Sequence, residues 1–522
     1  MYKPVVLVVL DGWGINSSVE GNAIKKANLP TIDKLNQNYP LIALQASGIS
    51  AGIPWGEPGN SEVGHTIMGS GKIIYQNLPR ITLSIQDRSF FTNEVLFNGM
   101  QNVTKNKSSL HLLGLVSEGS VHSNKEHLFA LLEMAKEQKV KKVFLHIFTD
   151  GRDSQPTSGI QIVKEVQEKM DAIGVGEIAS ICGRNWAMDR NNNWDRTEKA
   201  YRLLANGEGI KITDPLTYMD QSYKKNVTDE YLEPAVVIKN NKPLALIQDN
   251  DTVIFFNFRE DRARQLTKAF VVPEFKKVKR DKLLKLTFIT MTEYEKSLPV
   301  KVVFPPEKTK NGLGEVLSNY KKKQLRIAET EKYAHVTYFF NGGREEPWPG
   351  EDRILIPSPS VAKYDSEPEM SAAKITQKTV EEIQSEKYDF ILMNYANADM
   401  VGHTGNIDAA IKAVTSIDKS LSILIPSVLE KDGCLLITAD HGNVEEMIDP
   451  YTGQTITEHS NNPVPLWMIT KNNHRHKTPA EVIEEEENIR GLLSDIAPTI
   501  LDIFEIPKPV EMNGESLLTV LK

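Results

Sequence analysis

The sequence predicts an α/β fold. The first observation is a set of short apolar runs rich in β-branched residues, each followed by a polar loop and then a helical stretch. Continuous apolar runs of this kind are typical of parallel strands with helices on both faces of the sheet. The second observation is that the loops carry charged residues and histidines, as expected at strand ends where open α/β sheets bind ligands. The runs lie at residues 5–10, 110–116, 142–148, 178–181, 252–258, 389–395 and 434–438.

The composition limits the possible classes of protein. A chain of 522 residues is too long for one ordinary core, and its 40% hydrophobic and 25% charged residues are typical of a globular protein in water. The formal net charge of −8 argues against general nucleic-acid binding. Cys182 and Cys434, the only cysteines, are far apart, which argues against a disulfide framework or a cysteine-based zinc site. The apolar run at residues 5–10 is too short for a signal peptide or membrane span, so we expect a cytoplasmic protein. We also expect a monomer.

The polar loops fall into two chemical classes, and this division predicts the domain limits. Loops near the start of the chain and after residue 390 carry carboxylates, histidines and a serine, whereas loops between about 120 and 265 carry arginines. If the first class forms one site, both ends of the chain build one domain and the middle is an insertion. We place a discontinuous domain at residues 1–77 and 308–522, and an inserted domain at residues 78–307.

The first class of loops predicts a metal site. The pair Asp399 and His403, in "NADMVGH", is weak evidence by itself. Two further stretches with carboxylates or histidines, "TADHGN" and "TEHSNNP", lie within about sixty residues of it. Asp11 directly follows an apolar run, where a carboxylate is costly unless something pairs with it. The mixed oxygen and nitrogen donors suit two divalent ions such as Mn²⁺ or Zn²⁺, and a carboxylate-rich set favours Mn²⁺. The candidate ligands are Asp11, Ser61, Asp399, His403, Asp440, His441 and His459.

Ser61 lies in "EPGNSEVGH", a stretch with too little apolar periodicity for a core helix or strand. A serine among polar residues and glycines is more often a turn residue or a helix cap. The alternative is a nucleophile, because two ions would lower the pKa of its hydroxyl and neutralise a phosphoryl group under attack. Lys332, in "AETEKYAH", would add a positive charge there, although an exposed lysine is the commoner interpretation.

The second class of loops predicts an anion site. Arginine presents paired donors to carboxylate or phosphate oxygens, so several arginines at equivalent strand ends favour a small, doubly charged anion. Each arginine taken alone is more often part of a surface ion pair. His122 and Asp153 are the titratable groups in these loops best suited to contact substrate hydroxyls or to act as acid or base. The arginines are Arg152, Arg184, Arg190, Arg259, Arg262 and Arg264.

Eight motifs, in family order, resemble those of the cofactor-independent phosphoglycerate mutases, two-domain members of the alkaline phosphatase superfamily. The resemblance implies an alkaline-phosphatase-like doubly wound sheet domain interrupted by an inserted α/β transferase domain, which closes around the substrate. It also implies interconversion of 3-phosphoglycerate and 2-phosphoglycerate, in glycolysis and gluconeogenesis, with two Mn²⁺ ions and without 2,3-bisphosphoglycerate. The resemblance extends from residue 7 to about residue 467, and its motifs are "VLDGWG", "GNSEVGH", "TDGRD", "GRNWAMDRNNNWDR", "ETEKYAHVTYFFNGG", "GEDRILIPSP", "NADMVGHTG" and "TADHGN".

Carried over by motif, the resemblance implies a role for each candidate residue. Ser61 would be the nucleophile that becomes phosphoserine, with Asp153 as a proton carrier and Lys332 as a catalytic cation. One ion would be held by Asp399, His403 and His459. The other would be held by Asp11, Ser61, Asp440 and His441. Substrate would be bound by His122, Arg152, Asp153, Arg184, Arg190, Arg259, Arg262 and Lys332.

Two other functions stay open at this point. A metal-dependent phosphatase or sulfatase of the same superfamily would use the same first half-reaction, but the arginine-rich insertion argues against a hydrolase that admits water. A non-catalytic anion-binding protein on the same fold is the second, and the complete set of candidate ligands argues against it. The chain departs from the usual family pattern at Thr66-Ile67, Asn185-Trp186, Ala398 and Arg344, none of which is a proposed ligand or substrate arginine.

Overall fold

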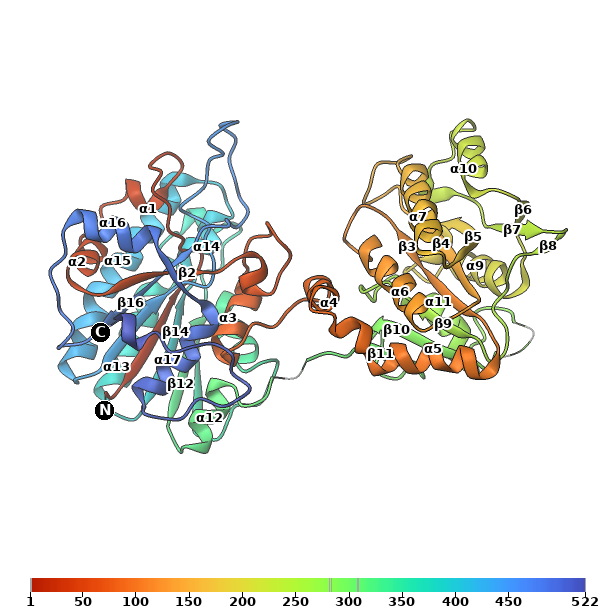
Figure 1. Ribbon diagram of the computed structural model, residues 1–522. Helices are drawn as coiled ribbons and strands as arrows, with labels where there is room; N and C mark the ends of the chain where they lie inside the picture. Colours follow the sequence, from red (N-terminus) through yellow and green to blue (C-terminus); the bar gives the residue numbers. More distant parts are fainter. Residues whose placement is uncertain (1, 281, 283, 308, 522) are drawn as a thin grey trace. The chain divides into compact units, whose positions relative to one another are not determined.

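The computed structural model describes residues 2–280, 282, 284–307 and 309–521. The chain divides into two compact units (Figure 1). Unit 1 comprises Met1–Gln76 and Glu307–Lys522, and unit 2 comprises Asn77–Pro306. Both units combine a sheet with helices, so the predicted α/β fold class is confirmed. No described helix has the length and apolar character needed to span a membrane.

The sheet of unit 1 is built around β1 (Val5–Leu10), whose six residues are all apolar and buried. β1 pairs in parallel with β14 (Phe390–Tyr395) on one side and β15 (Cys434–Thr438) on the other. The remaining strands are β2 (Leu41–Gln45), β12 (Gln324–Glu329), β13 (Glu351–Ile356), β16 (Val464–Ile469) and β17 (Ile489–Leu492). Within the described residues the order is β13-β12-β14-β1-β15-β16-β2-β17, and β16 runs antiparallel to both of its neighbours.

The helices of unit 1 pack in two groups. The long helix α15 (Ile407–Glu430) contacts α1 (Ala23–Lys26), α2 (Pro30–Asn38) and α13 (Ala372–Gln384). α3 (Ser61–Ser70) contacts α12 (Leu313–Asn319) and α17 (Ile496–Ile503). The other described α-helices of unit 1 are α14 (Asn397–Gly402), α16 (Pro479–Glu487) and α18 (Leu518–Leu521). Two separate groups of helices are consistent with a doubly wound sheet.

The sheet of unit 2 is centred on β3 (Leu110–Val116), which pairs in parallel with β4 (Val143–Thr149) and β9 (Thr252–Phe255). β4 pairs in parallel with β5 (Glu177–Gly183). The other strands are β6 (Ile210–Ile212), β7 (Ala235–Lys239), β8 (Lys242–Pro243), β10 (Thr287–Thr292) and β11 (Lys301–Phe304). For the described residues the order is β11-β10-β9-β3-β4-β5-β7-β6, with β8 beside β7.

Every apolar run predicted as a strand is one. The seven runs correspond to β1, β3, β4, β5, β9, β14 and β15, and the pairings between them are all parallel, as predicted. The helices of unit 2 are α4 (Asn77–Gln86), α5 (Glu94–Asn106), α6 (Lys125–Glu137), α7 (Gly159–Ile173), α8 (Arg184–Ala187), α9 (Trp194–Asn206), α10 (Pro215–Tyr223) and α11 (Arg264–Val271).

A row of buried polar side chains, joined by hydrogen bonds, crosses the middle of the unit 2 sheet. His111 Nδ1 on β3 lies 2.9 Å from His146 Nε2 on β4, and His146 Nδ1 lies 2.8 Å from Ser180 Oγ on β5. At the other end, His111 Nε2 lies 3.2 Å from Asp251 Oδ2. Because a slip of one residue would turn these side chains away from their partners, the chain of hydrogen bonds fixes the register of the three strands.

Candidate metal centre and arginine group

The candidate metal ligands lie in unit 1, at the end of its sheet where the central parallel strands have their carboxyl termini. Asp11 directly follows β1, and Asp440 and His441 follow β15. Asp399 lies on α14, the short helix that follows β14. His459 precedes β16, and because β16 is antiparallel to β15, its start lies at the same edge as the ends of the parallel strands.

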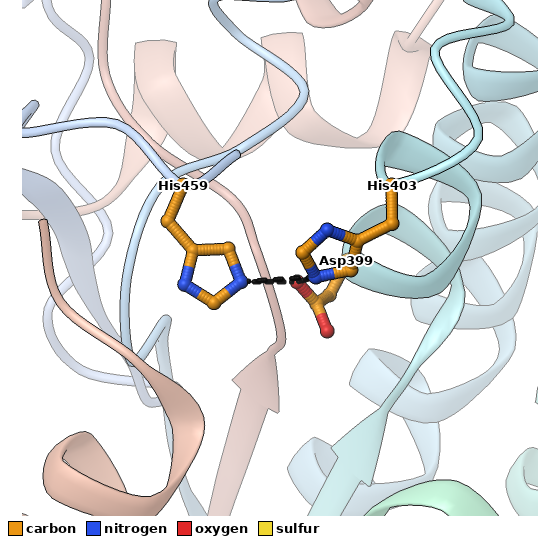
Figure 2. A group of neighbouring side chains, drawn as sticks. All are labelled: Asp399, His403 and His459. Atoms are coloured by element: carbon orange, nitrogen blue, oxygen red, sulfur yellow. Dashed lines mark hydrogen bonds and ion pairs between the residues drawn. The ribbon is translucent and has the colours of Figure 1, made fainter. Parts of the chain in front are cut away.

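Asp399, His403 and His459 form one compact group (Figure 2). Asp399 Oδ1 lies 3.2 Å from His403 Nε2 and 3.1 Å from His459 Nε2, and the two Nε2 atoms are 3.1 Å apart. The opposite ring nitrogens are held by backbone carbonyls, His403 Nδ1 by Thr457 at 2.7 Å and His459 Nδ1 by Gly59 at 2.8 Å. These bonds turn both Nε2 atoms toward the carboxylate, which is how ligand histidines are commonly oriented.

Ser61 lies beside this group, at the start of α3. The side chain of Asn60 caps the helix by accepting a hydrogen bond from the Val63 N–H at 3.0 Å. Ser61 Oγ lies 3.1 Å from Asp11 Oδ1 and 2.9 Å from His441 Nε2. The hydroxyl is therefore directed into the site rather than into solvent, and only 6% of the residue is exposed.

Lys332, in the turn after β12, joins the two groups. Its Nζ lies 2.6 Å from Asp11 Oδ1, 2.6 Å from Asp399 Oδ2 and 2.8 Å from Ser61 Oγ. Burial alone would lower the pKa of Lys332, but the carboxylates of Asp11, Asp399 and Asp440 raise it above its usual value. In the same way, burial opposes ionisation of Asp11, yet Lys332 and His441 hold the pKa of Asp11 well below its usual range. The lysine is a buried cation, not an exposed side chain.

The donor set fits divalent cations. Asp11, Asp399 and His441 form a second group whose ligand atoms, like those of the first group, lie within 4.8 Å of one another. Asp440 Oδ2 is buried and has no hydrogen-bond partner among the described residues, although His65 Nδ1 lies 3.2 Å away. A buried carboxylate oxygen without a partner is costly, and a cation would satisfy it. Oxygen and imidazole donors together suit Mn²⁺ or Zn²⁺.

The arginine group lies in unit 2, also at strand ends. Arg184, directly after β5, is buried, and its Nη1 donates to Asp150 Oδ1 at 2.6 Å and to Asp153 Oδ2 at 2.5 Å. Asp261 receives a hydrogen bond from Arg190 Nη1 at 2.7 Å and lies 3.3 Å from Arg259 Nε. These carboxylates hold arginines that would otherwise repel one another.

His122, Arg262 and Arg152 complete this group. His122 lies between Asp153 and Asp261, at 3.7 and 3.6 Å, and burial together with nearby Arg184 lowers its pKa to about 4. Burial and the neighbouring guanidiniums of Arg184, Arg190 and Arg152 lower the pKa of Arg262. The structure therefore brings five of the six predicted arginines together. Arg264 is separate, because its Nε donates to the Tyr294 carbonyl at 2.9 Å and it lies 3.6 Å from Glu295.

Comparison with known proteins gives close relatives over the whole chain. Residues 81–296 match the family described as "BPG-independent PGAM N-terminus (iPGM_N)". The 2,3-bisphosphoglycerate-independent phosphoglycerate mutase of Clostridium botulinum is 50% identical over 517 residues, 99% of each chain. That of Clostridium acetobutylicum is 50% identical over 516 residues, again 99% of each chain. The chain belongs to this family.

The family assignment made from the motifs is thus confirmed. A solved structure of Leishmania mexicana phosphoglycerate mutase, obtained at low cobalt concentration, is 29% identical to this chain with a TM-score of 0.53, covering 99% of this chain and 97% of its own. Membership of the phosphoglycerate mutase family and the buried carboxylate and histidine groups both point to binding of divalent metal.

In this phosphoglycerate mutase family member, the structure adds residues that the sequence did not single out. Asn394 Nδ2 donates to Asp11 Oδ2 at 2.7 Å and lies 3.2 Å from His65 Nε2. Asn443 Nδ2 donates to Asp399 Oδ1 at 3.2 Å. In unit 2, Asp150 also accepts a hydrogen bond from Ser117 Oγ at 2.5 Å. His65 ends the "GNSEVGH" motif and so left a signal, whereas Asn394 is hidden within an apolar run.

Proposed function

We propose that the chain interconverts 3-phosphoglycerate and 2-phosphoglycerate in two steps, with Ser61 as the nucleophile. The observation that carries the proposal is the position of Ser61 Oγ, within 3.1 Å of Asp11, His441 and Lys332 at the start of a capped helix. Free N–H groups and the dipole at a helix start favour negative charge, so they would stabilise a phosphoryl group on this serine. The Lys332 ammonium adds a donor in a buried, low-dielectric setting, where its charge acts strongly.

The metal centre is the second part of the proposal. Asp399, His403 and His459 would hold one Mn²⁺ ion. Asp11, Ser61, Asp440 and His441 would hold a second. When bound, the ions would lower the pKa of the Ser61 hydroxyl and neutralise charge on the phosphoryl group. Support comes from the convergence of the Nε2 and carboxylate atoms and from the buried Asp440 Oδ2, which has no hydrogen-bond partner among the described residues.

The arginine group would bind the carboxylate of the substrate and retain glycerate between the two steps. Its side chains would be Arg152, Arg184, Arg190, Arg259 and Arg262, with His122 close to the hydroxyls. This proposal assigns phosphoryl transfer to residues 1–77 and 308–522 and glycerate binding to residues 78–307, the inserted transferase segment.

Asp153 would carry the proton between the two substrate hydroxyls. In the first step the Ser61 alkoxide forms a bond to phosphorus, the bond from phosphorus to the glycerate oxygen breaks, and that oxygen takes a proton carried by Asp153. In the second step the other glycerate hydroxyl gives its proton to Asp153 and attacks phosphoserine, which releases Ser61 as the alkoxide. The cycle balances, since in each step one bond to phosphorus replaces another, and Ser61 and Asp153 both end as they began. The Arg184 contact at 2.5 Å holds Asp153 in place for this exchange.

The reaction is tested by its products. Mn²⁺-loaded protein is mixed with 3-phosphoglycerate, without 2,3-bisphosphoglycerate, and ³¹P NMR follows 2-phosphoglycerate and inorganic phosphate together. We expect 2-phosphoglycerate without phosphate, and a loss of about 10⁴-fold or more in Ser61→Ala. Ser70→Ala is the matched control, because Ser70 lies at the far end of the same helix and its hydroxyl donates to the Ile67 and Lys72 carbonyls.

Two results would refute this proposal. Accumulation of inorganic phosphate would identify a phosphatase, in which water replaces the second hydroxyl. Full activity of Ser61→Ala would remove the phosphoserine step. A complete loss in Ser70→Ala as well would show that Ser61→Ala reports a folding defect rather than the missing nucleophile.

A further inference from the structure

The loops that carry the metal ligands leave the sheet of unit 1 at different strands. One loop follows β1 and carries Asp11. The single connection between β15 and β16 supplies the other two, its first part carrying Asp440 and His441 (the second loop) and its last part carrying His459 (the third loop). A metal site forms in advance of binding only if such loops are held at fixed positions relative to one another. Backbone bonds link them in part, as between the Ser460 N–H and the Gly442 carbonyl at 3.1 Å and between the Ile15 N–H and the Pro463 carbonyl at 2.7 Å.

Glu445 contacts all three loops. Its side chain is fully buried. Oε2 accepts hydrogen bonds from the Gly14 N–H at 2.9 Å, in the first loop, and from the Asn443 N–H at 2.8 Å, in the second. Oε1 accepts hydrogen bonds from the Ser460 hydroxyl and from Asn462 Nδ2 at 3.1 Å, both in the third loop. The Glu445 carboxylate therefore accepts hydrogen bonds from all three of these loops.

Two glycines of the sequence motifs are explained by this carboxylate. A Cβ added to Gly14, in "DGWG", would lie 2.3 Å from Glu445 Cδ, and one added to Gly442, in "DHGN", would lie 2.3 Å from Glu445 Oε1. Neither glycine has a positive φ, so the backbone conformation does not itself require glycine at either position. What requires glycine is the close approach of both loops to Glu445 and, at Gly442, also that of Ser460 Oγ, which would lie 2.3 Å from the added Cβ.

We propose that Glu445 is a positioning residue for the metal centre: it binds no metal and no substrate, but holds the loops of Asp11, of Asp440 and His441, and of His459 in the arrangement that divalent ions need. This inference rests on the metal centre of the proposed function. The four donors are neutral, so the carboxylate acts through directed hydrogen bonds rather than through an ion pair. Its removal would leave the Gly14 and Asn443 N–H groups buried without partners, a cost that the loops relieve by moving apart.

The direct test is Mn²⁺ binding to the metal-stripped full chain, followed by the EPR signal of free Mn²⁺. We expect Glu445→Ala to weaken Mn²⁺ binding on the order of 10- to 100-fold, as for other residues that orient metal ligands. Glu445→Gln should stay within about threefold of the unchanged protein, because its carbonyl oxygen accepts both backbone N–H groups and its amide donates to the Ser460 hydroxyl. Only the Asn462 bond is lost, and Asn462 Nδ2 also donates to Glu446. If Glu445→Gln restores the Mn²⁺ affinity that Glu445→Ala loses, residue 445 acts through its hydrogen bonds and not through its negative charge.

Glu446→Ala is the matched control. Glu446 is the next residue in the chain, and among the described residues of the third loop its side chain accepts a hydrogen bond only from Asn462, at 2.7 Å. We expect Mn²⁺ affinity in this variant within twofold of the unchanged protein. Equal weakening in Glu445→Ala and Glu446→Ala would indicate general loosening and would overturn the proposal.

The remaining outcomes are also decisive. Unchanged Mn²⁺ affinity in Glu445→Ala, or glutamine as poor as alanine, overturns the role of Glu445 and leaves the proposed metal centre intact. Absence of Mn²⁺ binding in the unchanged protein refutes the metal centre itself. If circular dichroism shows that metal-free Glu445→Ala is unfolded, Ser460→Ala replaces it, since it removes one donor of the third loop. Unchanged affinity in Ser460→Ala would then overturn the proposal.

Discussion

Unit 1 and unit 2 both gather charged side chains at the carboxyl ends of parallel strands, but they hold them differently. In unit 1, Asp11, Asp440 and His441 are completely buried, and Lys332 is bonded to three oxygens at once. In unit 2, Arg190 and Arg259 are nearly half exposed and share the carboxylate of Asp261.

The difference reflects what each set of side chains is proposed to bind. Metal ligands must converge on a point within fractions of an ångström, so Asp11, Asp440 and His441 are buried, and further hydrogen bonds such as those of Asn394 and Glu445 fix the site. Arginines that bind an anion exchange one carboxylate partner for another, and partial exposure keeps that exchange inexpensive. Changes to the buried side chains of the metal centre should therefore act on the rate of the chemical step, and changes to the exposed arginines of unit 2 on substrate affinity.

The largest effect in this comparison is expected for Lys332→Met. Methionine keeps the length of the side chain but removes the ammonium that lies between Asp11 and Asp399. We expect kcat to fall on the order of 10²- to 10³-fold, the usual loss for one donor to a charged transition state. Steady-state kinetics at saturating Mn²⁺ measure it, with the exposed Lys363→Met as control. A change in KM alone would break the proposed division between the units.

A smaller effect, on affinity, is expected for Arg259→Ala. Loss of a charged donor to the substrate should raise KM for 3-phosphoglycerate about 10- to 100-fold and change kcat by less than about threefold. Arg264→Ala is the matched control from the same segment, because Arg264 is bonded to the Tyr294 carbonyl instead. If the two variants have the same KM, Arg259 does not contact the substrate.

The smallest effect concerns stability against acid. Burial lowers the pKa of His127 to about 3 and that of His122 to about 4, below the usual value of 6.5. Since the unfolded chain binds protons at these sites below pH 6.5 and the folded chain does not, stability is complete above pH 6.5 and falls as the pH drops. The slope is about 1.4 kcal/mol per pH unit for each histidine.

Replacement of one such histidine measures its share of that slope. In urea unfolding between pH 6.5 and 5, His127→Leu should lose stability by about 2 kcal/mol less than the unchanged protein. Its loss of the Thr82 contact at 3.1 Å lowers stability equally at every pH and does not alter this difference. If the free energy of unfolding had the same pH dependence in both proteins, His127 would be protonated in the folded protein, contrary to this prediction.

Much of the fold was predictable because its central strands are continuous apolar runs. The antiparallel direction of β16 was not, since direction depends on the path of the connecting chain and leaves no pattern in "VPLWMI". It matters for the site, because it brings His459 to the edge where Asp440 lies. His111 and His146 were also hidden, as each sits singly within an apolar run and finds its partner on a neighbouring strand.

The candidate ligands were predictable because they lie in motifs at strand ends, where a polar residue after an apolar run is conspicuous. Glu445 was not, although it lies four residues after His441. In the sequence it is one of two adjacent glutamates, and only the folded chain shows that Glu445 is buried while Glu446 is partly exposed. The contacts of Glu445 come from residues more than four hundred positions away as well as from its neighbours, and spacing carries no record of them.

β1 is synthesised long before the strands that cover its two edges. Residues 77–306 and more lie between it and β14, so at ribosomal speeds of about 5–20 residues per second the interval is roughly 20–80 s. Throughout that time six consecutive apolar residues have both edges open, the kind of segment that pairs with other chains. Unit 2, whose residues are contiguous, is complete before β14 is made. Slower translation of residues 77–306 would lengthen the time for which β1 is unpaired, and it should lower the yield of folded protein.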